Sequence, residues 1–65
     1  MEMAMNLKAA RINAGLSRKE VGKALEMHPN TIASYESYKT TPDMETAQKI
    51  CKLYGCNFDD IKWSM

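Results

Sequence analysis

The chain has 65 residues, of which 45% are hydrophobic and 26% charged, and its formal net charge is +1. A chain of this size buries only roughly 60% of the surface that it exposes when unfolded, so we expect one domain over residues 1–65 with one compact core. The near balance of charge gives no support by itself to nucleic-acid binding, because proteins that bind through bulk charge are usually strongly basic, so any such function must come from how the charges are arranged. No run approaches the roughly 18 apolar residues of a membrane span, and no signal peptide is recognisable, so a cytoplasmic protein is expected.

Apolar residues at helical spacing predict a first helix over residues 5–14. One row of this helix consists of Met5, Ala9 and Ile12, and a second row consists of Leu7, Ala10 and Ala14. Gly15 follows, and glycine commonly ends a helix because it adopts a left-handed conformation without strain.

A second helix is predicted over about residues 18–25, and a third over about residues 29–37. Ser17 is a good N-cap for the second helix, and Glu20 three residues later completes a capping box. Pro29 stands at the first position of the third helix, where its missing N–H costs nothing. The positions of the second helix expected to face the core are Val21, Ala24 and Leu25.

A fourth helix is predicted between Asp43, which can cap it, and Gly55, which ends it. Its core-facing stripe is expected to consist of Met44, Ala47, Ile50, Cys51 and Tyr54. Asn57 then begins a last short turn over residues 58 to about 62, placing Phe58 and Ile61 against the core. Trp63 fits either core filling or a subunit contact.

The segments together predict an all-α fold, a compact bundle of four to five short helices. No alternation with a period of two residues has useful length, so no strand is predicted. Cys51 and Cys56 fit a disulfide, half of a metal site or free thiols, and no second cysteine pair and only His28 accompany them. Free thiols are favoured, because free cysteine behaves as a small core hydrophobe, and we expect no metal and no cofactor.

The second and third predicted helices are joined by only a few residues, so they must cross steeply, as in a helix-turn-helix. In that unit the second helix lies in the DNA major groove, and the first crosses the backbone. Gly22 is small where the two helices approach closely, while Ile32 and Tyr35 face inward. A helix that enters a groove roughly 12 Å wide should be narrow and polar on its outer side. The residues on that outer side are Asn30, Ala33 and Ser34.

The stretch "LSRKEVGKALEMHPNTIASYES" followed by "KTTPDMETAQKICKLYGCNFDDI" resembles the Cro and C1-type phage repressors, also called the XRE family. The resemblance covers about residues 7–61 and implies a lambda-repressor-like DNA-binding domain. It also implies an Arg11–Glu36 ion pair that ties the first helix to the third. Two departures are Glu26 and Tyr38, which stand where relatives often have glycine with a positive φ. Pro29 is a third, because many relatives read a base there with glutamine.

The resemblance implies two sets of DNA contacts. The base-reading set consists of His28, Pro29, Asn30, Ala33 and Ser34, of which Asn30 suits adenine and Ala33 suits a thymine methyl group. The phosphate-binding set consists of Ser17, Arg18, Lys39, Thr40 and Thr41. Alternatives are ordinary solvated polarity for Asn30 and Ser34, and a simple helix cap for His28.

The predicted function is a sequence-specific transcriptional regulator of phage, prophage or mobile-element type that inserts its third helix into an operator. Its expected partner is double-stranded DNA, bound by a homodimer, with no membrane and no small-molecule substrate. No inducer domain or self-cleaving tail is expected. The alternative is a protein–protein interaction module, such as an antitoxin or an antirepressor partner. An enzyme is disfavoured, since His28 has no cysteine or carboxylate at recognisable catalytic spacing.

Overall fold

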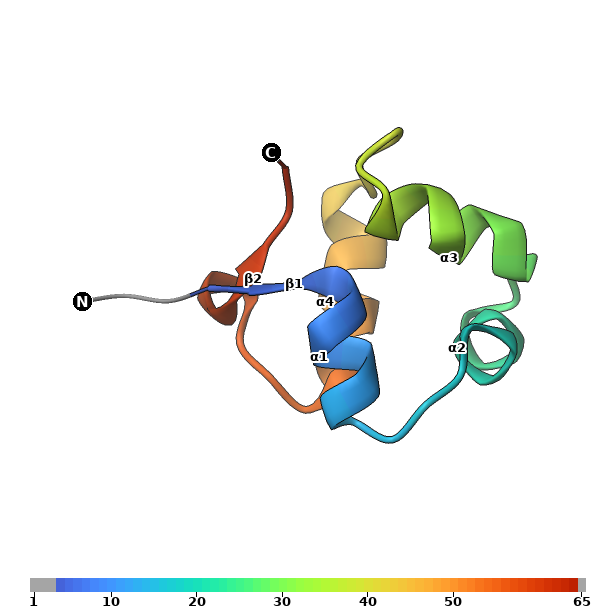
Figure 1. Ribbon diagram of the computed structural model, residues 1–65, viewed down its shortest axis with the longest axis horizontal. Coiled ribbons are helices and arrows are strands. Elements are labelled where there is room, and N and C mark those ends of the chain that lie inside the picture. The colour runs from blue at the N-terminus through green and yellow to red at the C-terminus, as the bar shows by residue number, and fades with distance from the viewer. Residues whose placement is uncertain (1–3, 65) are drawn as a thin grey trace.

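The computed structural model describes residues 4–64, which form four α-helices, one 3-10 turn and two short strands (Figure 1). In chain order the elements are β1 (Met5–Asn6), α1 (Leu7–Asn13), α2 (Arg18–Leu25), α3 (Pro29–Glu36), α4 (Met44–Tyr54), the 3-10 turn η1 (Phe58–Asp60) and β2 (Ile61–Lys62). The predicted all-α class is confirmed. None of the described helices has the length and apolar character that crossing a membrane requires.

Local capping groups begin and end the helices close to where the sequence predicts. The Ser17 hydroxyl accepts from the Glu20 N–H at 3.1 Å, and the Glu20 carboxylate accepts from the Ser17 N–H at 2.8 Å. Asp43 Oδ1 accepts from the Thr46 N–H at 2.8 Å. Gly55 ends α4 with φ 71°. Each cap satisfies donors or acceptors that have no partner within the helix.

The core lies between α1, α3 and α4 and is closed by α2 and β2. It consists of Leu7, Ala10, Val21, Ile32, Ile50, Cys51, Tyr54 and Ile61. Of the two apolar rows predicted on α1, the row that contains Leu7 and Ala10 is buried, whereas Ile12 is 57% exposed. A fully buried aliphatic side chain such as Ile32 contributes roughly 1.5–3 kcal/mol relative to leaving it exposed.

The prediction that the first helix begins at Met5 is wrong, because Met5 and Asn6 form a strand. The Asn6 Oδ1 caps α1 by accepting from the Ala9 N–H at 2.7 Å. Met5 and Asn6 pair in parallel with Ile61 and Lys62 of β2. This small sheet was not predicted, and it replaces the last part of the turn expected over residues 58–62.

Three side chains expected in the core lie outside it. Met44 is 59% exposed because it is the first residue of α4, and Ala24 is exposed on α2. Phe58 is 41% exposed and stacks on Trp63, with ring centroids 5.0 Å apart. The indole N–H of Trp63 donates to the Phe58 carbonyl at 3.0 Å, which holds the two rings together. Trp63 is half-buried, so it partly covers the core.

Both cysteines are free thiols, as predicted; Cys51 lies in the last turn of α4, and Cys56 follows the end of that helix. Cys51 is buried and Cys56 is half-buried. Burial raises the pKa of both thiols; the neighbouring Cys56 raises the pKa of Cys51 further, and Asp60 raises that of Cys56. Both groups therefore stay protonated at neutral pH. Among residues 4–64, no three His, Cys, Asp or Glu side chains gather into a possible metal site.

Candidate nucleic-acid interface

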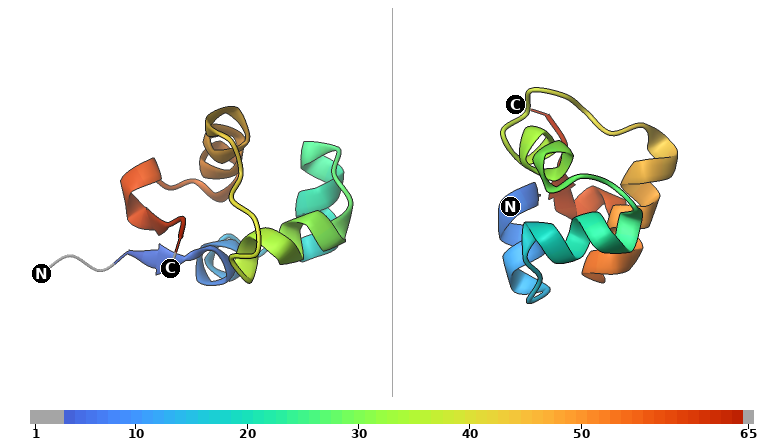
Figure 2. Two further views of the ribbon diagram at one scale, coloured as in Figure 1. Left: turned by 90° about the horizontal axis from the view of Figure 1, so that it is seen from above. Right: turned by 90° about the vertical axis from the view of Figure 1, so that its right-hand side faces the viewer.

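The helices α2 and α3 cross steeply and pack closely against each other (Figure 2). Gly22 makes this approach possible, because a Cβ atom there would lie 2.5 Å from the Met27 carbonyl oxygen. The Met27 N–H donates to the Gly22 carbonyl at 2.7 Å, which closes the end of α2. Glu26 adopts a left-handed conformation with φ 58° and turns the chain toward α3. The geometry is that of a helix-turn-helix.

The outer face of α3 carries small and polar groups, as the sequence predicts. Ile32 is 1% exposed and anchors the helix, and Tyr35 is half-buried against the core. The α3 segment lies at the rim of the fold, with the following loop extending from its C-terminal end (Figure 1). Asn30 is exposed, whereas Ala33 and Ser34 are partly exposed. These three side chains are therefore accessible from one side of the helix.

His28 caps α3: its Nδ1 accepts from the Asn30 N–H at 3.0 Å. An accepting Nδ1 carries no proton, so the neutral ring carries its hydrogen on Nε2, where it is a donor. His28 is exposed and Pro29 is half-buried. The structure therefore places His28 as a helix cap with one donor left over.

The loop after α3 exposes Lys39, Thr40 and Thr41. Tyr38 precedes them with φ 62°, so both positions where relatives often have glycine keep the left-handed conformation here. The Tyr38 hydroxyl donates to the Lys62 carbonyl at 3.0 Å, which ties the loop to β2. The helix α3 itself ends at Glu36, one residue before the predicted limit.

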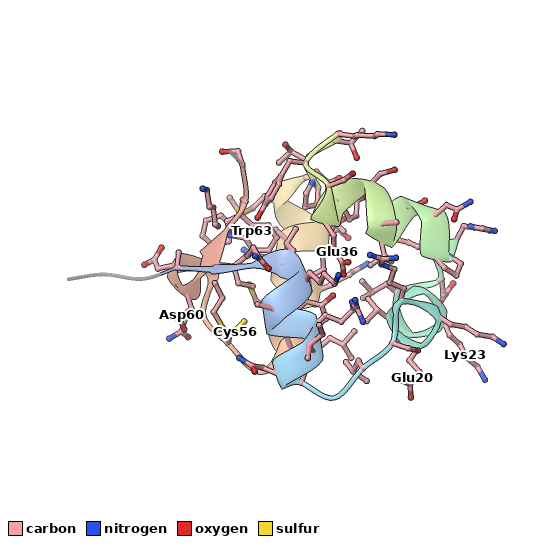
Figure 3. All side chains as sticks on the ribbon, in the orientation of Figure 1. Glu20, Lys23, Glu36, Cys56, Asp60 and Trp63 are labelled. Atoms are coloured by element: carbon pink, nitrogen blue, oxygen red, sulfur yellow. The ribbon has the colours of Figure 1, made fainter. Side chains whose placement is uncertain are left out.

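The Glu36 carboxylate joins α1, α2 and α3 (Figure 3). Arg11 Nε donates to Glu36 Oε2 at 2.6 Å, and Arg11 Nη1 donates to the Leu16 carbonyl at 2.8 Å. Arg18 Nε donates to Glu36 Oε1 at 3.0 Å. Burial, and then the negative charge of Glu36, raise the pKa of Tyr54 to about 12. From the sequence, Glu36 was paired with Arg11 and Arg18 was placed on phosphate alone, so the sharing of this carboxylate by Arg18 was missed.

The start of α2 presents Arg18 to solvent, with 45% of its side chain exposed. The capping box occupies the N–H groups of Ser17 and Glu20. The hydrogen bond that the Glu20 carboxylate accepts from the Ser17 N–H lowers the pKa of Glu20. The box therefore leaves the N–H groups of Arg18 and Lys19 as the donors at this helix start.

The surface that runs from α3 into the following loop has no exposed negative charge. Between Met27 and Pro42 the sequence contains one acidic residue, Glu36, whose side chain is 4% exposed and paired with two arginines. Lys39 adds a positive charge to this stretch. The predicted DNA contacts between His28 and Thr41 thus lie on a neutral-to-basic stretch, although the net charge of the whole chain is only +1. The other two, Ser17 and Arg18, lie at the start of α2, where Glu20 is also exposed.

An open groove of about 500 Å³ lies between the C-terminal end of α2 and α4. It is lined by Ala24, Leu25, Glu26, Lys49, Lys52 and Leu53. None of the site residues predicted from the sequence lines it, so the groove and the α3 surface are separate features.

Comparisons with known proteins agree with this geometry. The chain is 34% identical over 59 residues to the HTH-type transcriptional regulator ImmR of Bacillus subtilis (strain 168), a match that covers 91% of this chain and 46% of ImmR. It is 28% identical over 61 residues to the Uncharacterized HTH-type transcriptional regulator YgzD of the same bacterium, covering 94% of this chain and 92% of YgzD. The chain thus spans about half the length of ImmR. No solved structure matches the chain significantly.

A family model described as Helix-turn-helix matches residues 7–61, the same stretch that carries the resemblance to the Cro and C1-type repressors. This match covers most of the chain and includes both α2 and α3. The chain therefore belongs to the XRE-type helix-turn-helix family.

Proposed function

We propose that this protein is a sequence-specific DNA-binding transcriptional regulator that inserts α3 into the major groove of an operator. The observation that carries the proposal is the surface of α3 and the following loop, whose exposed side chains are small, polar or basic. The two relatives, both named as transcriptional regulators, support it. The similarity to Cro and C1-type repressors favours a regulator of phage, prophage or mobile-element type.

In this proposal, phosphate contacts set the register and base contacts select the sequence. Ser17, Arg18, Lys39, Thr40 and Thr41 would bind phosphates on either side of α3. Asn30 is exposed near the start of α3 and would donate to and accept from adenine, while Ala33 would contact a thymine methyl group. Ser34 and the Nε2–H of His28 would supply further donors. Pro29, the first residue of α3, would set the direction in which the chain begins this helix.

A homodimer would place two copies of α3 in successive major grooves on one face of the duplex. Helix-turn-helix dimers bind half-sites roughly 34 Å apart, one helical turn of DNA. A single module with few contacts has limited affinity, and joining two modules raises the affinity without any new contact.

Selection from a randomised duplex library on the purified protein at about 150 mM salt tests the proposal. We expect an enriched inverted repeat with about one helical turn between half-sites. Weak, salt-sensitive retention with no enriched sequence would contradict operator recognition and would favour the protein–protein interaction module.

Substitution of Asn30 tests the base-reading surface. Asn30→Ala should weaken binding to the selected site by roughly 1–3 kcal/mol and relax selection at one base position. Gln48→Ala is the matched control, since Gln48 is an exposed amide on α4 outside the proposed surface. If Asn30→Ala weakens random duplexes as much as the selected site, Asn30 does not read a base.

A further inference from the structure

The cluster of Arg11, Glu36 and Arg18 contains two guanidinium groups and one carboxylate. Among the described residues, Glu36 is the only carboxylate within salt-bridge distance of either arginine. The cluster therefore carries one positive charge in excess. The side chains of Arg11 and Glu36 are 9% and 4% exposed, whereas that of Arg18 is 45% exposed, so the excess charge reaches solvent through Arg18.

The contact with Glu36 leaves most donors of Arg18 available. Glu36 Oε1 accepts from Arg18 Nε at 3.0 Å, and neither Nη of Arg18 hydrogen-bonds to another described residue. A guanidinium is planar, so holding it at Nε sets the direction in which its Nη donors point. Arginine binds phosphate best when two parallel N–H groups meet two oxygens, an arrangement that depends on orientation.

We propose that Glu36 is a positioning residue that holds Arg18 as a bidentate ligand for one phosphate of the DNA backbone. The inference rests on the proposed function, because it names how that surface binds phosphate. The bound phosphate supplies the second negative charge and makes the cluster neutral. Since Glu36 is the last residue of α3 and Arg18 the first of α2, this contact also sets the position of α3 relative to the backbone.

Two substitutions at Arg18 separate orientation from charge. Binding of a short labelled duplex is measured for wild type, Arg18→Lys and Arg18→Gln, with Lys52→Gln as a control for loss of one exposed positive charge on α4. We expect Arg18→Lys to weaken binding roughly tenfold although it keeps the charge, because lysine cannot make the bidentate contact. Wild-type affinity in Arg18→Lys would overturn the proposal.

A double-mutant cycle then tests the role of Glu36. Glu36→Ala removes both the acceptor of Arg18 Nε–H and one negative charge, so its own effect on affinity does not decide the matter. When Arg18→Lys is added to the Glu36→Ala variant, it should cost about twofold or less, because the orientation of Arg18 is already lost. The same tenfold loss in both backgrounds would show that Glu36 does not position Arg18.

The cycle needs a folded Glu36→Ala protein, and this variant is destabilised because Arg11 loses its buried partner. Nitrogen-15 spectra of the wild-type protein therefore provide an independent readout. The Arg18 Nε–H signal should be shifted from that of free arginine and should exchange slowly with water, both alone and with DNA bound. A signal averaged with water in the free protein would overturn the positioning role.

The same spectra separate this inference from the proposed function. If no duplex binds the wild-type protein, the regulator proposal fails, and the Arg18 signal still reports whether Glu36 holds the guanidinium. Inorganic phosphate at matched ionic strength should leave that signal unchanged. A saturable shift with inorganic phosphate would identify free phosphate as the ligand and overturn the assignment to the DNA backbone.

Discussion

Two corners flank α3, and in each a residue other than glycine is left-handed: Glu26 with φ 58° in the leading corner (residues 26–28), and Tyr38 with φ 62° in the trailing corner (residues 37–42). The leading corner is held by neighbours in sequence, since Met27 bonds to Gly22. The trailing corner has local bonds too, from the Tyr38 N–H to the Tyr35 carbonyl at 3.1 Å and from the Lys39 N–H to the Ser34 carbonyl at 3.0 Å. It is also joined to a distant segment by the bond between Tyr38 and Lys62. The first corner therefore depends on local sequence, whereas the second depends in addition on the completed fold.

The largest expected effect comes from filling the close approach in the leading corner. Gly22→Ala places a Cβ 2.5 Å from the Met27 carbonyl oxygen, so the backbone must move. We expect a loss near the upper end of the roughly 1–3 kcal/mol that overpacking costs, measured by urea unfolding. Gly15→Ala is the control, because its Cβ would meet nothing within 4 Å and only the strain of its positive φ remains. Equal stability of wild type and Gly22→Ala would contradict the requirement for close approach.

Substitution by glycine should have opposite effects on stability at the two corners. A left-handed conformation costs a non-glycine residue roughly 1–2 kcal/mol, so Glu26→Gly should raise the free energy of unfolding by about 1 kcal/mol. Tyr38→Gly relieves the same strain but removes a half-buried ring and its hydrogen bond to Lys62, so we expect a net loss. Thermal unfolding of both variants measures the difference. Tyr38→Phe removes only the hydrogen bond to Lys62 and should cost about 1 kcal/mol. Stabilisation by Tyr38→Gly would show that the ring and its hydrogen bond to Lys62 contribute little to stability.

The cap in the leading corner should have a smaller effect. His28→Ala leaves the Asn30 N–H without its side-chain acceptor and should cost about 1 kcal/mol of stability. His28→Asn keeps a side-chain acceptor and should retain most of that stability. Urea unfolding of the two variants measures how much the His28 cap contributes to stability. An unchanged unfolding midpoint for His28→Ala would show that the cap does not stabilise this corner.

Acid should weaken the helix start that follows the trailing corner. The Thr46 N–H lowers the pKa of Asp43 below its ordinary 3.8, so the unfolded chain binds more protons in acid. This stabilisation is complete above the unfolded pKa and is lost as the pH falls below about 4 through the folded pKa. Asp43→Asn accepts the same bond without titrating, so its unfolding midpoint should fall less between neutral pH and about pH 3. An identical fall in wild type and Asp43→Asn would contradict the assignment.

Features specified by neighbouring residues were predictable from the sequence. The capping box of Ser17 and Glu20 sets the start of α2, and Pro29 sets the start of α3, so both helices were placed to within one residue. The strands β1 and β2 were missed, because two residues carry no alternation that could be recognised. Helical spacing predicted the face on which Met44 lies, but it could not show that burial on this face begins only at Ala47, so that Met44 at the start of α4 is exposed.

The candidate site also combines features that local sequence predicts with features that only the folded structure shows. The outward face of α3 follows from helical spacing around Ile32, whereas the shared contact of Arg18 and Glu36 depends on how α2 crosses α3. No local pattern joins two residues so far apart in sequence. Base reading by Asn30 and Ser34 stays a prediction, and library selection is its direct test.

The parallel pairing of Met5 with Ile61 has a consequence for folding kinetics. It joins opposite ends of the chain, and closing so long a loop costs more entropy than any contact within the helix-turn-helix. We therefore expect the sheet to form after the transition state, once the helices have packed. Weakening it with Ile61→Val should speed unfolding and leave the folding rate nearly unchanged, so that only the unfolding arm of a chevron plot moves.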